Sequence, residues 1–228
     1  FGHNAIRVKD SLYNFDLVFD YGRYDFESKG FYLNFARGKL DYMVGRSAFE
    51  DFLSFYKYQN RQVNEQQLNL STKQKTAFYN FLTENMKPEK RYYPYDFFYN
   101  NCATKITDAI ESILADQIKY SPPIAFKKET FRNLIRSDLN INSWGSLAID
   151  IALGSKIDQK ATIKEHVFLP KNLYLLLENS IAASTNLKIV KKSKLLNSST
   201  ATTKTSEGLF SPLAILSLIA LLILFITF

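Results

Sequence analysis

Residues 14–26, NFDLVFDYGRYDF, alternate in the manner of a β-strand. One face collects large apolar side chains, namely Phe15, Leu17, Phe19 and Tyr21. The other face collects Asp16, Val18 and Asp20. Gly22 interrupts the alternation and predicts a turn or a bulge. We therefore expect a strand here that carries two carboxylates on one side.

Strand-prone sequence continues on both sides of this segment. Before it, Ala5, Ile6 and Val8 predict a short strand that turns at residues 9–11, and residues 31–44 extend the aromatic, strand-prone character. Amphipathic helices are expected later, at residues 71–84 with Ser71 as N-cap, at 101–114 and at 170–183. Strands followed by helices predict an α+β fold rather than a regular βαβ array.

The composition narrows the function classes. The 228 residues contain one cysteine and two histidines, which exclude a disulfide framework within the chain and disfavour a zinc site built from several cysteines or histidines. We accordingly expect no metal and no cofactor. No basic stripe with stacking aromatics stands out, so a nucleic-acid partner is not expected.

Residues 209–228 contain no charged side chain. An apolar run of about 20 residues is long enough to cross a bilayer, so we predict a transmembrane helix, which further spans could follow. A buried core helix is the alternative. Residues 1–187 would form the folded domain, and residues 188–208 a flexible linker rich in Ser, Thr and Lys.

The net charge of +7 is concentrated in that linker. Residues 188–208 hold five lysines and one glutamate and so account for four of the seven charges. Cations beside a membrane span are attracted to anionic lipid headgroups. A solvated tether that happens to be basic is the simpler interpretation, and the sequence leaves both open.

Cys102 stands at a position suited to nucleophilic chemistry. Asn101 is a good N-cap, which places Cys102 in the first turn of a helix, where the N–H groups and the helix dipole stabilise a thiolate. The same amides are suited to hold an oxyanion after attack on a carbonyl. His3, on an early strand, would act as general base and then as general acid.

A third group should orient the imidazole of His3. Asp16 is our first choice and Asp20 our second, because both lie on the same face of the next strand. Spacing alone does not decide this assignment. A lone cysteine and a distant histidine coexist in many proteins, and an inert buried Cys102 is the alternative.

Several motifs together resemble one family. They are FGHNAIRV (1–8), DLVFDYGRYDF (16–26), FARGKLDYMV (35–44), YPYDFFYNNCATKITD (93–108) and HVFLPKNL (166–173). They are similar to those of the Lnb family of Bacteroidota, the lipoprotein N-acyltransferases. The resemblance implies a papain-like periplasmic domain, similar to a circularly permuted NlpC-like fold in which the histidine strand precedes the cysteine helix.

The resemblance also implies a reaction and its partners. Cys102 would take a fatty acyl chain from a membrane phospholipid as a thioester and pass it to the α-amine of a diacylglyceryl-cysteine lipoprotein. His3 carries over from the FGH motif as the base, and Cys102 from NNC as the nucleophile. Asn101 carries over as helix cap or oxyanion support. The enzyme would sit in the inner membrane with its catalytic domain facing the periplasm.

Two other functions remain open on the sequence. A papain-like cysteine peptidase or amidase acting on cell-wall peptides would use the same Cys102–His3 pair. A membrane-tethered binding module with a degenerate site would need neither residue.

Overall fold

The computed structural model describes residues 2–24, 41–123, 126, 129–200 and 208–228. They form two compact units. The first comprises residues 1–126 with 163–199, and the second comprises residues 127–162 with 200–228. Helices and strands are mixed, as the α+β prediction requires. The candidate catalytic residues all belong to the first unit.

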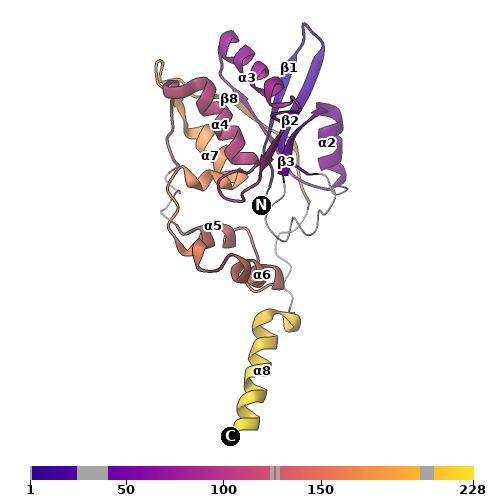
Figure 1. The fold of residues 1–228 in the computed structure, drawn as a ribbon, viewed down its shortest axis with the longest axis vertical. Coiled ribbons are helices and arrows are strands. Elements are labelled where there is room, and N and C mark those ends of the chain that lie inside the picture. The colour runs from indigo at the N-terminus through magenta and orange to yellow at the C-terminus, as the bar shows by residue number, and fades with distance from the viewer. Residues whose placement is uncertain (1, 25–40, 124–125, 127–128, 201–207) are drawn as a thin grey trace. The chain divides into compact units, whose positions relative to one another are not determined.

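The centre of the first unit is a four-stranded antiparallel sheet with the order β1-β2-β3-β5 (Figure 1). Its strands are β1 (Ala5–Asp10), β2 (Phe15–Arg23), β3 (Asp41–Ala48) and β5 (Tyr92–Pro94). The turn between β1 and β2 is closed by the Asp10 carboxylate, which accepts bonds from the N–H groups of Leu12 and Tyr13. The two early strands are therefore confirmed, but the turn lies at residues 11–14 rather than 9–11, because Lys9 and Asp10 still pair within the sheet.

Gly22 produces a bulge in β2, as the break in its alternation predicted. Tyr21 pairs with Val44 and Arg23 pairs with Met43. Because Met43 and Val44 are adjacent on β3, Gly22 is an extra residue in β2 with no pairing partner of its own. Its φ of +99° suits glycine. Because the bulge shifts the alternation by one residue, the Arg23 side chain lies on the same face as Asp20.

Helices cover both faces of this sheet (Figure 1). Helix α2 (Phe49–Tyr58) contacts β2 and β3 on the face that carries Asp20. The opposite face packs against α4 (Cys102–Leu114), which contacts α3 (Thr72–Asn85) and α7 (Pro170–Asn179). Burial of apolar side chains stabilises this side, which includes Phe19, Tyr21, Val44, Ala103, Ile106, Ile110 and Leu173.

Helix α3 begins as the sequence predicted. The Ser71 hydroxyl accepts the Gln74 N–H, and the Gln74 side chain accepts the Ser71 N–H, which completes a capping box. The third predicted helix is shorter than expected. It starts at Pro170 but ends at Asn179, where Ser180 takes an extended conformation before β7 (Ile181–Ala182).

Part of the expected linker is a strand. Residues Val190–Asn197 form β8, which pairs antiparallel with β4 (Val63–Leu68). This pairing places Lys194 opposite Glu65, and opposite charges across a ladder stabilise it. The remaining short elements of this unit are η1 (Ala115–Gln117), β6 (Ile118–Lys119), which pairs with β7, and η3 (Glu165–Phe168).

The second unit is helical. It contains α5 (Phe131–Arg136), α6 (Trp144–Leu153), η2 (Gly154–Asp158), η4 (Gly208–Phe210) and α8 (Pro212–Thr227). Arg132 joins three of these segments, because it donates to Asp158 at 2.6 Å, to Asp150 at 2.7 Å and to the Gly154 carbonyl at 2.6 Å. The indole N–H of Trp144 donates to the Phe210 carbonyl at 2.8 Å.

Three sequence predictions are not fully tested by these elements. Within the described ranges, no helix has both the length and the apolar character needed to cross a bilayer. The span over 209–228 and the boundaries 1–187 and 188–208 therefore stay predictions. Most of the strand expected over 31–44 falls outside the described residues, and only its end, in β3, is described.

Candidate active site

Cys102 is the first residue of α4, and Asn101 caps that helix. The Asn101 side-chain oxygen accepts the N–H groups of Ala103 and Thr104 at 2.8 and 3.0 Å. The Thr104 hydroxyl accepts the Asn101 N–H at 2.8 Å. The Asn101 amide nitrogen donates to the carbonyls of Phe97 and Phe168, each at 2.8 Å. Asn101 is therefore bound both to the first turn of α4 and to the segments that contain Phe97 and Phe168, and these bonds hold the half-buried Cys102 in place.

The Cys102 sulfur lies among hydrogen-bond donors. Burial alone would raise the pKa of the thiol, but the His3 imidazole and the backbone N–H groups of Asn4 and Ala103 hydrogen bond the sulfur and lower that pKa below its ordinary value. Such donors stabilise the charged form of a thiol over the neutral form.

His3 interacts with both the Cys102 sulfur and the Asp20 carboxylate. Its Nε2 atom is 3.5 Å from the Asp20 carboxylate, and the two side chains are only 20% and 10% exposed. Burial opposes the charged imidazolium, but the hydrogen bonds and charges of Asp20 and Cys102 raise the pKa of His3 to about 9. The two shifts together favour a thiolate on Cys102 beside an imidazolium on His3.

Asp20 is itself held in place by Arg23. The guanidinium donates to one Asp20 oxygen at 2.9 and 2.6 Å and to the Ser47 hydroxyl at 2.6 Å. Burial would raise the pKa of Asp20, but His3 and Arg23 lower it, so the carboxylate stays ionised. The bulge at Gly22 makes this clamp possible, because it turns Arg23 onto the Asp20 face.

Asp16, our first choice from the sequence, lies elsewhere on the same face. It accepts two bonds from Arg7, at 2.7 and 2.5 Å, and Arg7 also donates to Glu65. Asp16 pairs with Lys9 near the turn, whereas Asp20 pairs with Ala5 near His3. Four residues of strand separate the two carboxylates by about 13 Å. The geometry thus brings Asp20, our second choice, to His3.

Gly22 lies close to the side chains of both Cys102 and His3. A Cβ atom at position 22 would be 3.9 Å from the Cys102 Cβ and 4.0 Å from the His3 Cε1. These are ordinary contact distances, so the requirement for glycine comes mainly from the φ of +99°. The strand can therefore pass close to both residues without a side chain between them.

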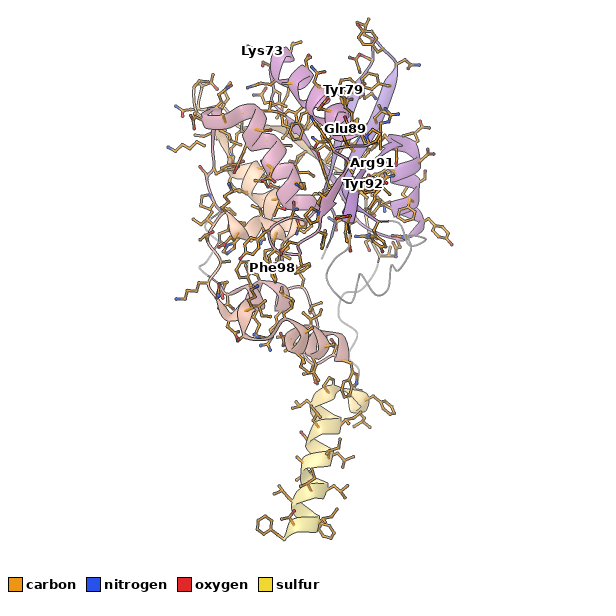
Figure 2. All side chains as sticks on the ribbon, viewed as in Figure 1. Lys73, Tyr79, Glu89, Arg91, Tyr92 and Phe98 are labelled. Carbon is orange, nitrogen blue, oxygen red and sulfur yellow. The ribbon has the colours of Figure 1, made fainter. Side chains whose placement is uncertain are left out.

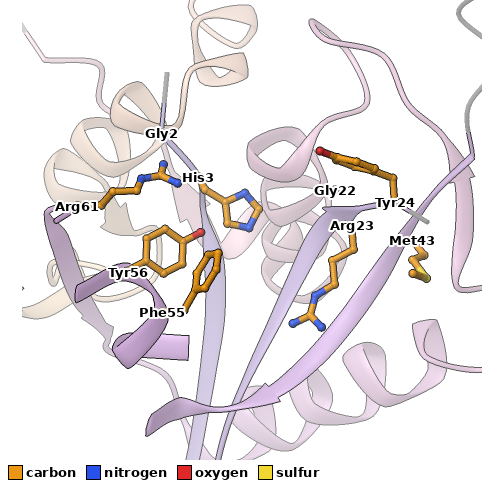
Figure 3. A pocket seen from close by; sticks show the side chains of 9 residues that line it. All are labelled: Gly2, His3, Gly22, Arg23, Tyr24, Met43, Phe55, Tyr56 and Arg61. Atoms are coloured by element: carbon orange, nitrogen blue, oxygen red, sulfur yellow. The ribbon is translucent and has the colours of Figure 1, made fainter. Parts of the chain in front are cut away.

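A cavity of about 540 Å³ adjoins His3 (Figure 3). It is lined by Gly2, His3, Gly22, Arg23, Tyr24, Met43, Phe55, Tyr56 and Arg61. Aromatic and thioether side chains form much of the wall, and His3 gives it a proton-transfer group. Among the described residues, no group of three or more His, Cys, Asp or Glu side chains is arranged to hold a metal ion.

A family comparison covers Cys102, His3, Asp20 and the residues that line the cavity. A model of the Lnb N-terminal periplasmic domain matches residues 1–137, which is more than half of the 228 residues. The chain belongs to the Lnb family. The resemblance inferred from the motifs is therefore confirmed, and the matched Lnb domain is described as periplasmic. No curated protein and no solved structure matches the chain.

Sequence reasoning missed two contributors to the Lnb site. Arg23 follows Asp20 by three residues, and simple alternation places it on the opposite face. Only a bulge brings the two together, and the predicted interruption at Gly22 was the available signal. The N–H of Asn4 reaches the sulfur through the backbone, and no residue type signals such a contact.

Replacing Asn101 with alanine should weaken both the Lnb fold and the reactivity of Cys102. The variant removes the hydrogen bonds from Asn101 to the carbonyls of Phe97 and Phe168 and to two N–H groups of α4, so we expect a loss of about 1–3 kcal/mol in urea unfolding. Ser71→Ala, at the cap of α3, is the matched control and should cost about 1 kcal/mol. Only Asn101→Ala should also slow alkylation of Cys102, and an equal rate in both variants would contradict the role assigned to this cap.

Proposed function

We propose that this protein is a cysteine-dependent lipoprotein N-acyltransferase of papain-like chemistry. The observation that carries the proposal is the Cys102–His3–Asp20 cluster within a chain of the Lnb family. Cys102 is the nucleophile, His3 moves the proton and Asp20 orients and charges His3. Asn101 fixes the helix start that presents the sulfur.

In the first half-reaction, the Cys102 thiolate attacks an ester carbonyl of a membrane phospholipid. The amides at the start of α4 and the N–H of Asn4 are the candidate donors to the oxyanion. The carbon–oxygen ester bond breaks as His3 gives its proton to the departing glycerol oxygen. A lysophospholipid leaves, and the acyl chain remains on Cys102 as a thioester.

In the second half-reaction, the α-amine of a diacylglyceryl-cysteine at a lipoprotein N-terminus attacks the thioester carbonyl. Neutral His3 takes the amine proton, the carbon–sulfur bond breaks, and the thiolate is restored beside the imidazolium. The product is an amide, and no water or cofactor enters the balance. Apolar walls around His3 favour the amine over water as the second nucleophile.

Both proposed substrates reside in a membrane, and the second unit has an apolar helix suited to contact with a membrane. Apolar side chains project from α8 on all sides (Figure 2), and those of Leu213, Leu218 and Phe225 are 68, 69 and 84% exposed. Exposed apolar surface on this scale marks a membrane or partner site. We propose that α8 inserts into inner-membrane lipid and that the catalytic unit works on the periplasmic side.

The test is the mass of a reporter lipoprotein's N-terminal peptide. Cells that express the protein should yield a peptide heavier by one acyl chain than cells without it, and cells that express Cys102→Ser should not. Purified protein incubated with phospholipid vesicles should gain one acyl chain on Cys102. Cleavage of cell-wall peptides without any acyl thioester would instead support the peptidase alternative and refute the transferase.

A further inference from the structure

Arg61 brings a positive charge to the cavity beside His3. Figure 3 shows Arg61 and Tyr56 reaching toward His3 from the same side of the cavity. The other arginine in the wall, Arg23, is bound to Asp20 at 2.6 Å. Within the part of the chain that the structure describes, Arg61 forms no ion pair with a carboxylate. Its charge is therefore available to a ligand.

The end of α2 fixes the backbone of Arg61. Asn60 adopts a left-handed conformation with φ +52°, and the N–H groups of Asn60 and Arg61 donate to the carbonyls of Lys57 and Tyr56, each at 2.9 Å. This is the Schellman arrangement that ends many helices. The Asn197 side chain of β8 adds a bond to the Arg61 carbonyl at 2.7 Å.

The same turn places the Arg61 guanidinium against an aromatic ring. Its carbon atom lies 4.9 Å from the centre of the Tyr56 ring, a distance at which a cation and a π-system attract each other. Stacking restrains the planar group while its N–H donors remain able to bind a ligand. Arg61 is therefore a pre-positioned cation in the wall of the site.

We infer that Arg61 binds the phosphodiester of the donor phospholipid. This inference rests on the proposed function and names the group that selects its first substrate. A guanidinium matches a phosphate through two parallel charge-assisted hydrogen bonds. The aromatic and thioether walls of the same cavity suit the apolar parts of a lipid.

The chemistry explains why the phosphate belongs on this side of His3. His3 must give its proton to the glycerol oxygen that leaves, and the phosphate is attached to the same glycerol a few bonds away. The departing half of the donor therefore occupies the space next to His3, which is the cavity that Arg61 lines. The acyl half remains with Cys102.

The positive charge of Arg61 also distinguishes the donor from the acceptor. The acceptor carries an amine that is cationic when protonated, and a nearby guanidinium disfavours it. Arg61 thus favours entry of an anionic donor while the cysteine is free. Loss of Arg61 should affect the first half-reaction more than the second.

The experiment compares two acyl donors with the full chain. Formation of acyl-Cys102 is followed by intact mass with phosphatidylglycerol and with diacylglycerol, which lacks the phosphate, each in the same neutral detergent. We expect Arg61→Gln to raise the KM for phosphatidylglycerol about tenfold to 100-fold with a smaller effect on kcat, and to leave the diacylglycerol rate unchanged. The KM of Arg61→Lys for phosphatidylglycerol should fall between those of the wild type and Arg61→Gln, because lysine keeps the charge but loses the planar fork.

Arg46→Gln is the matched control, since Arg46 is exposed on β3 outside the cavity lining. It should retain the wild-type preference for phosphatidylglycerol. If Arg61→Gln also retains this preference, or reacts more slowly with both donors to the same extent, the inference about Arg61 is overturned and the proposed function is not affected. Failure of the wild-type protein to form acyl-Cys102 with either donor would instead overturn the proposed function.

Discussion

Replacing His3 with alanine should slow acyl-Cys102 formation by about 10²–10⁴-fold, the usual contribution of a positioned acid–base group. It should also change the thiol itself. His3 hydrogen bonds the sulfur and lowers the pKa of Cys102, so that pKa should rise when the imidazole is removed. Alkylation by iodoacetamide, which requires the thiolate, should then need a higher pH.

The wild-type pH profile follows from the two shifts. The thiolate–imidazolium pair is present above the lowered pKa of Cys102 and below the pKa of His3, about 9. Acyl-enzyme formation should fall as the pH drops and the thiolate is protonated, and again as the pH rises through about 9 and the proton donor is lost. Cys102→Ala, with no thiol, is the blank for alkylation. Identical alkylation profiles in His3→Ala and wild type would show that the pair does not form.

Asp20→Asn should be the second most damaging change, with a loss of about 10²–10⁴-fold in acyl transfer, as expected for the orienting member of a triad. The amide removes the charge that stabilises the imidazolium, so the pKa of His3 should fall from about 9 toward its ordinary value. The upper limit of the pH profile should move down with it. A pH titration of acyl-enzyme formation measures both effects.

Asp16→Asn is the matched control, because it makes the same chemical change on the same face of β2. Asp16 binds Arg7 rather than His3, so acyl transfer should stay within about tenfold of wild type. Its half-exposed ion pairs should contribute only about 1 kcal/mol to stability. A greater loss of transfer in Asp16→Asn than in Asp20→Asn would restore our first choice from the sequence.

The choice between these two carboxylates shows where sequence reasoning stops. Alternation places both on one face, and it does so correctly. Which carboxylate meets His3 depends on the register of β1 against β2, and the alternation of side chains does not specify that register. The pairing of Ala5 with Asp20 is set by the turn at residues 11–14 and by the packing of both strands.

Helix starts were easier to predict, because caps are local. The N-caps Ser71 and Asn101 each have their partner three residues ahead in the sequence, and the capping signal needs no tertiary contact. Strand β8 shows the opposite case. Its lysines and serine resemble a tether, and only the pairing with β4 makes this segment a strand.

Gly45 has a consequence for variation within the family. The Arg23 side chain crosses β3 directly over this residue, and a methyl group there would overlap the side chain and push the guanidinium away from Asp20. Positions 23 and 45 therefore form one steric constraint. Relatives that carry any larger residue at position 45 should lack arginine at position 23 and support the carboxylate by other means, so the two columns of an alignment should change together.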